Sequence, residues 1–195
     1  MQILRRETYR RMPWKNGQGM TEEIAIFPLE SGMEDFDWRL SIAHVGADGP
    51  FSLFPGLDRS IALLDGDGMA LSLPDGKSEM LTKTGQPFAF PGDWATSSRN
   101  LAAKTIDLNI MTRRGRFRHE MRRQQHFTLA TRSEAAMTLV VLNQDVTVVD
   151  KHQPLSLHRF DTVILEPGEP WPLKASMPSD TTGCDLLVVT LEREQ

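Results

Sequence analysis

Apolar and polar residues alternate along much of this chain with a period of two, which is typical of half-buried β-strands. The pattern is clearest between residues 35 and 73, where it predicts strands over 37–45, 59–64 and 69–73, separated by turns rich in Gly, Asp and Pro. The first of these strands has two faces, one with Trp38, Leu40 and Ile42 and the other with Arg39, Ser41 and Ala43. An arginine inside such a pattern must point to solvent or meet an anion.

Similar strands are predicted on both sides of this region. Residues 21–27 form one, with Glu23, Ala25 and Phe27 on the same face. A longer strand is predicted over residues 101–111, and its alternation points the side chains of Asp107 and Asn109 to one side. Shorter apolar runs indicate strands near Leu81 and over 87–90, and an edge strand at Ile3 and Leu4.

The second half of the chain has the same pattern of short strand-like segments separated by turns. Further strands are predicted over 127–129, 138–142, 146–149, 161–165 and 185–191. No long amphipathic helix is evident in the sequence. Many short strands at close spacing, punctuated by Gly, Pro and Asp, predict an all-β fold, either an antiparallel sandwich or a barrel.

An arginine-rich segment separates the two halves. It carries six arginines and one glutamate between Arg113 and Arg123. We interpret residues 113–124 as a solvated linker between an N-terminal half, 1–112, and a C-terminal half, 125–195, packed as one compact unit. The alternative is a nucleic-acid contact, but the segment has few neighbouring aromatic residues and no recognition-helix pattern.

Composition narrows the functional class. The chain has 195 residues, a net charge of −4 and a single cysteine, Cys184, so no intramolecular disulfide can form. No apolar run reaches the length of a membrane span, and the N-terminus has no apolar signal-peptide core. We therefore expect a cytoplasmic protein without a membrane partner, and the net charge argues against bulk nucleic-acid binding.

Familiar catalytic and metal-binding motifs are missing. The five histidines form no HxH, HxxH or HxxxH pair, so neither a metal site nor a cofactor is predicted. There is no G-x-S-x-G elbow and no phosphate-binding loop ending in Gly-Lys. Cys184 has no base nearby in the sequence and is interpreted as a buried, inert thiol.

The remaining candidates are polar residues within strand patterns: Glu23, Arg39, Arg59, Asp107 and Asn109. Each could simply face solvent. In an antiparallel barrel, however, inward positions recur at every second residue of several strands, so these side chains could converge in a polar pocket. Arginine binds carboxylates in a bidentate manner and asparagine can pair with an amide, which implies a small ligand carrying both groups. Lys15 and Asn16, on a glycine-flanked loop, could close over the mouth.

Three blocks of the sequence strongly resemble the HutD/Ves family: residues 13–24, 35–68 and 107–115. They occur in the family's order and span the first two thirds of the chain. Gln18 departs from the family pattern, which usually has a run of three glycines at this loop.

The resemblance implies a bicupin, in which two cupin-like antiparallel β-barrel halves lie in one chain. The histidines that bind metal in enzymatic cupins are missing: Arg59 lies near the first motif, and Ala95 and Thr96 lie near the second. The family is associated with histidine utilisation, whose intermediates include N-acylated glutamates such as formylglutamate.

Two functions remain open, with the first favoured. In one, the chain is a binding protein that modulates histidine utilisation; Arg39 and Arg59 bind carboxylates, Asn16 and Asn109 contact the amide, Glu23 and Asp107 hold the arginines, and Trp14 and Lys15 form a lid. In the other, it is a metal-independent isomerase or hydrolase with Glu23 or Asp107 as the general base. Pairing of sheet edges into a homodimer is compatible with either function.

Overall fold

The computed structural model describes residues 1–102, 104–126, 136–171, 173–175 and 182–194. These consist of β-strands and connecting turns, with one short 3-10 helix at Arg6–Thr8. The predicted all-β fold is confirmed. The chain divides into two compact units, an N-terminal unit of Arg10–His119 with Glu194 and a C-terminal unit of Met1–Tyr9 with Glu120–Arg193.

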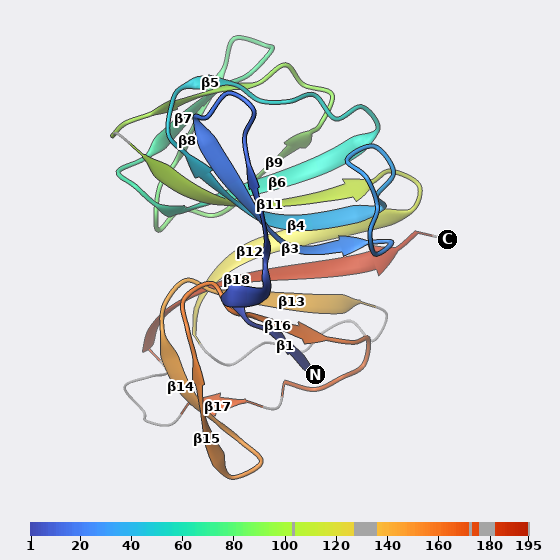
Figure 1. The fold of residues 1–195 in the computed structure, drawn as a ribbon, viewed down its shortest axis with the longest axis vertical. Helices are drawn as coiled ribbons and strands as arrows, with labels where there is room; N and C mark the ends of the chain where they lie inside the picture. Colours follow the sequence, from blue (N-terminus) through green and yellow to red (C-terminus); the bar gives the residue numbers. More distant parts are fainter. Residues whose placement is uncertain (103, 127–135, 172, 176–181, 195) are drawn as a thin grey trace. The chain divides into compact units, whose positions relative to one another are not determined.

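Two sheets build the N-terminal unit (Figure 1). The larger sheet has the order β2-β3-β4-β11-β6-β9, with strands at Arg10–Pro13, Gly19–Phe27, Trp38–Val45, Thr105–Arg113, Leu57–Asp65 and Phe88–Pro91. The smaller has the order β5-β10-β7-β8, with strands at Gly49–Pro50, Ser97–Asn100, Met69–Ser72 and Ser78–Leu81. All these pairings are antiparallel.

The inner face of the larger sheet changes from apolar to polar along its strands. At one end, Val45 and Leu63 pack with Met69 and Leu71 of the smaller sheet in a buried core. Towards the other end, the same faces of β4 and β11 carry polar residues, because register pairs Asn109 with Ser41 and Met111 with Arg39. The predicted alternation is therefore confirmed in β4 and in residues 105–111 of β11, and it places the polar side chains together. The strand predicted from residue 101 begins only at Thr105.

A bulge in β3 corrects the prediction that Glu23, Ala25 and Phe27 share one face. The register with β4 shifts between Glu23 and Ala25, so Ile24 is the extra residue. Glu23 pairs with Ser41, on the inner face of β4, whereas Phe27 pairs with Trp38, on the opposite face. An inserted residue reverses the side-chain alternation beyond it, which no strict period of two can reproduce.

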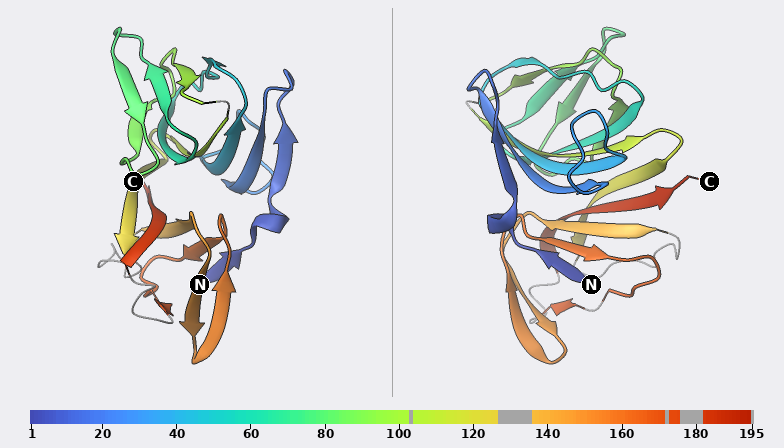
Figure 2. Two further views of the ribbon diagram at one scale, coloured as in Figure 1. Left: turned by 90° about the vertical axis from the view of Figure 1, so that its left-hand side faces the viewer. Right: turned by 45° about the vertical axis from the view of Figure 1, so that its right-hand side comes forward.

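The C-terminal unit also has two sheets, seen from two further sides in Figure 2. One has the order β1-β16-β13-β18-β12, with strands at Gln2–Leu4, Thr162–Leu165, Met137–Leu142, Thr182–Arg193 and Phe117–His126. The other has the order β15-β14-β17, with strands at Gln153–Leu157, Val146–Asp150 and Lys174–Ala175. The edge strand predicted at Ile3 and Leu4 is confirmed as β1. The strand predicted over 127–129 lies outside the described residues.

The linker predicted over 113–124 was wrong for most of its length. Residues from Phe117 onward form the ten-residue strand β12, and the boundary between the units falls within it, after His119. Met121 and Arg123 are buried, whereas Arg118 and Glu120 are exposed. Buried and exposed residues thus alternate along β12 with a period of two. The sequence alone indicates a linker because so many of these residues are charged.

Several arginines of this segment form ion pairs with carboxylates or donate hydrogen bonds to backbone carbonyls. Arg114 contacts both Asp58 and Asp93, at 2.7 Å and 2.6 Å. In the C-terminal unit, Arg123 donates a 2.8 Å hydrogen bond to Asp185.

Within the described part of the chain, no helix combines the length and hydrophobicity needed to cross a membrane.

Candidate functional site

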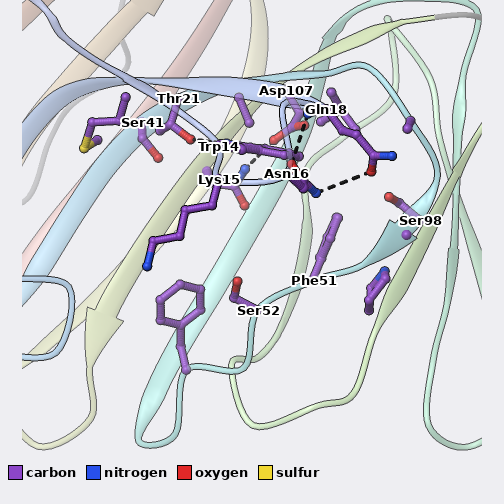
Figure 3. A pocket seen from close by; sticks show the side chains of 18 of the residues that line it. Trp14, Lys15, Asn16, Gln18, Thr21, Ser41, Phe51, Ser52, Ser98 and Asp107 are labelled. Atoms are coloured by element: carbon purple, nitrogen blue, oxygen red, sulfur yellow. Dashed lines mark hydrogen bonds between the residues drawn. The ribbon is translucent and has the colours of Figure 1, made fainter.

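A cavity of about 590 Å³ opens in the N-terminal unit. Strands β4, β6 and β11 supply its inner wall, and two segments, residues 12–18 with the end of β2 and residues 47–54 with β5, supply much of the rest. Figure 3 shows side chains of both segments, including Trp14, Asn16, Phe51 and Ser52, around this space. Its volume lies within the range of about 300–1,000 Å³ that small-molecule sites occupy.

Seven of the eight residues predicted to bind ligand line this cavity: Trp14, Lys15, Asn16, Arg39, Arg59, Asp107 and Asn109. The eighth, Glu23, lies behind Arg39 and accepts a 2.7 Å hydrogen bond from its Nε atom. The polar pocket expected from the strand alternation is therefore present as a geometric feature. Ligand binding by these residues stays a prediction.

Arg59 is the most unusual side chain of the site. It is 6% exposed, and its guanidinium carbon lies 5.0–5.4 Å from the ring centroids of Phe51, Phe54 and Phe90. Burial lowers the pKa of Arg59 to about 10, against the opposing influence of Asp107, so the group is a cation at neutral pH. An aromatic enclosure attracts a cation but does not replace the hydration that burial removes.

The hydrogen bonds of Arg59 leave it incompletely satisfied. Its Nη2 atom donates to the side-chain oxygen of Asn109 at 3.0 Å, and Nη1 lies 3.5 Å from the carbonyl oxygen of Ser52. Its Nε atom is buried without a hydrogen-bond partner, and Arg59 forms no salt bridge with a carboxylate among the described residues. A buried cation in this state is stabilised by an incoming anion.

Asp107 lies near Arg59 on the neighbouring strand and is 1% exposed. Its Oδ1 atom accepts a hydrogen bond from the Asn109 amide, whereas its Oδ2 atom has no partner. Burial raises the pKa of Asp107 to about 7, while Arg59 and the Asn109 hydrogen bond act in the opposite direction. Asn109 thus bridges the two charged groups, and much of the amide capacity predicted to contact a ligand is already used.

The Arg39–Glu23 ion pair sits beside this cluster. The two side chains are 5% and 10% exposed, so the pair is nearly buried. Because Glu23 compensates its charge, Arg39 contributes less free positive charge to the cavity than Arg59 does. The predicted role of Glu23 in holding an arginine matches this geometry.

The loop that carries Trp14, Lys15 and Asn16 is held by its own hydrogen bonds. The backbone amide of Trp14 donates to the carbonyl of Gly19 at 2.9 Å, and its indole Nε1 donates to Thr21 at 2.9 Å. The side-chain oxygen of Asn16 accepts from the amide of Gln18 at 3.0 Å, and Asn16 Nδ2 donates to the Gln18 side chain (Figure 3). Lys15 is exposed.

Several lining residues were missed by sequence reasoning. They are Thr21, Ser41, Phe51, Phe54 and Ser98. Ser41 shares a strand face with Arg39, so the alternation could have identified it. The two phenylalanines lie between strands, in a segment with no periodic signal, and only the folded chain brings them to Arg59.

A second polar cluster lies outside this cavity. The His119 ring is bonded on both sides, with Nε2 2.9 Å from Ser60 Oγ and Nδ1 2.7 Å from Thr112 Oγ1. Burial lowers the pKa of His119 to about 4, against the influence of Asp58, so the ring is neutral at pH 7. Among the described residues, no group of three or more His, Cys, Asp or Glu is placed to hold a metal ion.

Comparisons with known proteins agree with this architecture. The HutD family model matches residues 6–182. A Pseudomonas putida protein, described as an uncharacterized 21.2 kDa protein in the hutC 3' region, is 40% identical over 142 residues, covering 73% of this chain and 72% of its own. Protein Ves of Citrobacter koseri is 43% identical over 117 residues, covering 58% and 60%.

Solved structures extend the similarity to the fold. The structure of HutD from Pseudomonas fluorescens SBW25 (formate condition) matches with a TM-score of 0.80 and 29% identity, covering 100% of this chain and 99% of that one. A cupin 2 conserved barrel domain protein from Leptotrichia buccalis matches with a TM-score of 0.54 and 8% identity, covering 95% and 96%. At that identity the second match concerns the fold alone, which is cupin-like.

Proposed function

This chain belongs to the HutD family, and from that premise we propose that it is a cytoplasmic small-molecule-binding protein that modulates histidine utilisation. Its ligand is an N-acylated glutamate such as formylglutamate, held in the arginine-lined cavity. A relative named for its place beside hutC supports the metabolic context. We further propose that the two units are the two cupin-like halves of a bicupin.

The observation that carries the proposed function is the state of Arg59. This guanidinium is buried among three phenylalanine rings, charged at neutral pH, and has a free Nε–H. A carboxylate is the group that best satisfies such a donor, because its oxygens accept charge-assisted hydrogen bonds. The cavity is large enough for a second carboxylate and an amide, and Lys15 is a further cation among its lining residues.

Calorimetric titration of the metal-stripped protein with N-formyl-L-glutamate tests the function, with L-glutamate and glutarate as controls. We expect saturable binding that prefers the acylated amino acid. Arg59→Met keeps the apolar length of the side chain and should weaken binding about 10- to 100-fold, since hydrogen bonds to charged groups contribute about 1.5–3 kcal/mol. Arg99→Met, at an exposed arginine on β10, is the matched control and should bind like wild type. Equal binding by Arg59→Met and wild type would overturn the assignment.

A metal-independent enzyme acting on the same class of compound is the second candidate. The free oxygen and the near-neutral pKa of Asp107 favour it, because a general base works best when its pKa lies near the operating pH. Glu23 is the weaker candidate base, since its carboxylate already accepts a hydrogen bond from Arg39. Incubation with N-formyl-L-glutamate followed by mass spectrometry decides between the two, as a binding protein leaves the compound unchanged.

Nucleic acid and a second copy of the chain are the other partners considered. Carboxylates pair with Arg114 and Arg123, which supports a structural role for the arginine-rich segment rather than contact with phosphates. Retention on a nucleic-acid column at low salt would contradict this assignment. Pairing of two copies through sheet edges is tested by light scattering.

A further inference from the structure

We propose that the cavity takes up a proton together with its carboxylate ligand, and that Asp107 is the residue that carries this proton. The inference rests on the proposed function in one respect, since it assumes that an anion binds beside Arg59. It goes beyond that function by specifying which residue is protonated when the ligand binds and how the affinity depends on pH.

The first step is the geometry of two buried charges. Arg59 on β6 and Asp107 on β11 are 6% and 1% exposed, and Asn109 bridges them by accepting from one and donating to the other. They form no direct salt bridge, so each retains an unsatisfied atom: Nε of Arg59 and Oδ2 of Asp107. Oδ2 of Asp107, which has no hydrogen-bond partner, is the atom that would carry the proton.

The second step is the charge balance of the cavity wall. The other charged lining residues are Arg39 on β4, which Glu23 on β3 neutralises, and Lys15 and Asp48 on exposed loop positions. When Asp107 is ionised, the buried pair with Arg59 sums to zero. A carboxylate bound at Arg59 would then place a second negative charge in the same buried region, which low-dielectric surroundings penalise.

Protonation of Asp107 removes this conflict. Arg59 then remains as a single buried cation, and one bound carboxylate restores neutrality. Burial already raises the pKa of Asp107 to about 7, and Arg59 holds it down. An anion that neutralises Arg59 removes that restraint, so the pKa of Asp107 rises further in the complex.

The consequence is proton-linked binding with a defined pH profile. The empty site should be about half protonated at pH 7 and about one tenth protonated at pH 8, so uptake per ligand should grow from about 0.5 to about 0.9 protons. If only the protonated form binds, affinity should fall about fivefold from pH 7 to pH 8 and about tenfold for each further pH unit. Below pH 6 both uptake and pH dependence should vanish.

Calorimetry in buffers of different ionisation enthalpy measures this uptake directly. Wild type is titrated at pH 7.5 with N-formyl-L-glutamate, glutarate and acetate in HEPES, imidazole and Tris at equal ionic strength. The slope of observed enthalpy against buffer ionisation enthalpy gives the protons exchanged, and we expect uptake of about 0.5–0.9. Asp107→Asn, which keeps the shape and the Asn109 contact, should bind with zero slope and should exceed wild type in affinity by about tenfold at pH 8.

The outcomes separate this inference from the proposed function. Binding by wild type with zero slope overturns proton coupling and leaves the ligand assignment intact. Proton uptake with acetate or glutarate but no binding of N-formyl-L-glutamate supports coupling and overturns the ligand assignment. An unchanged slope in Asp107→Asn assigns the proton to another group and overturns the role of Asp107. Absence of binding by all three probes overturns both proposals.

Discussion

Glu23 and Arg39 lie on neighbouring strands and form a nearly buried ion pair, with Nε of Arg39 donating to the Glu23 carboxylate at 2.7 Å. Glu23 pairs with Ser41 on the inner face of the sheet, directly before the bulge in β3 beyond which the strand reverses its faces. The ion pair determines how charge is distributed in the cavity, because it leaves Arg59 as the arginine without a carboxylate partner.

Replacing Glu23 by Gln tests this pair. The substitution removes the anion and leaves Arg39 as an uncompensated buried cation, so we expect a loss of about 2–4 kcal/mol in the free energy of unfolding. Urea denaturation at pH 7 measures it. The double variant Glu23→Gln/Arg39→Met should recover a substantial part of the loss, because it removes the stranded charge. A single variant within about 0.5 kcal/mol of wild type would show that the pair contributes little.

Gly19→Ala tests how the loop that carries Trp14, Lys15 and Asn16 is held in place. A Cβ atom at Gly19 would lie 2.6 Å from Cε3 of Trp14 and 2.7 Å from the carbonyl oxygen of His44, so the indole must move. We expect a loss of about 1–3 kcal/mol in stability and weaker ligand binding, because Trp14 lines the cavity. Thermal denaturation and calorimetry measure the two effects.

Gly49→Ala is the matched control for that experiment. Gly49 also lines the cavity, but a Cβ atom there would meet no heavy atom within 4 Å, and its φ is not in the left-handed region. It should therefore leave stability close to wild type. If both glycine variants behave alike, the steric argument about Trp14 is wrong.

His119 should make stability depend on pH in the acidic range. Its pKa is lowered by burial from about 6.5 to about 4, so the unfolded chain binds a proton more readily than the folded one. The stabilising contribution is full above pH 6.5 and is lost as the pH falls towards 4, by an amount on the order of 3 kcal/mol. Urea denaturation of wild type and His119→Gln between pH 4 and 8 should show a steeper acid loss in wild type. His126→Gln, at an exposed histidine, should follow the wild-type curve.

Asp161 should hold the N-terminal segment to the rest of the C-terminal unit. Its carboxylate is 2% exposed and accepts from Arg5 Nη1 at 2.7 Å and from the backbone amides of Arg6 and His158 at 3.0 Å each. Asp161→Ala removes the buried carboxylate that accepts all three hydrogen bonds, while Arg5 Nη1 keeps its 2.8 Å bond to the carbonyl oxygen of Ser156. We expect a loss of about 2–4 kcal/mol in the free energy of unfolding.

Hydrogen exchange over residues 1–9 provides the local readout for this change. Protection there should fall markedly in Asp161→Ala and less in Asp161→Asn, which retains one acceptor oxygen. Unchanged protection in Asp161→Ala would mean that the pairing of β1 with β16 and the Tyr9 hydroxyl contacts suffice to hold the segment.

The sequence by itself determined the all-β class. It also determined which residues share a face on the main strands of the N-terminal unit. Period-two alternation correctly placed Arg39 and Ser41 on one face and Asp107 and Asn109 on one face, because side chains in a regular strand must alternate. Three sequence blocks in the family's order also supported the family resemblance, which the comparisons confirm.

Other features were decided only by tertiary structure. The bulge at Ile24 depends on pairing with β4, and the buried Arg123 of β12 depends on Asp185, which is distant in sequence. Most of all, the state of Arg59 depends on what surrounds it. Phe51 and Phe54 from the segment before β6 and Phe90 from β9 exclude water from its guanidinium, and Asn109 bridges it to Asp107. A side chain that could have faced solvent is therefore a buried cation without a carboxylate partner among the described residues.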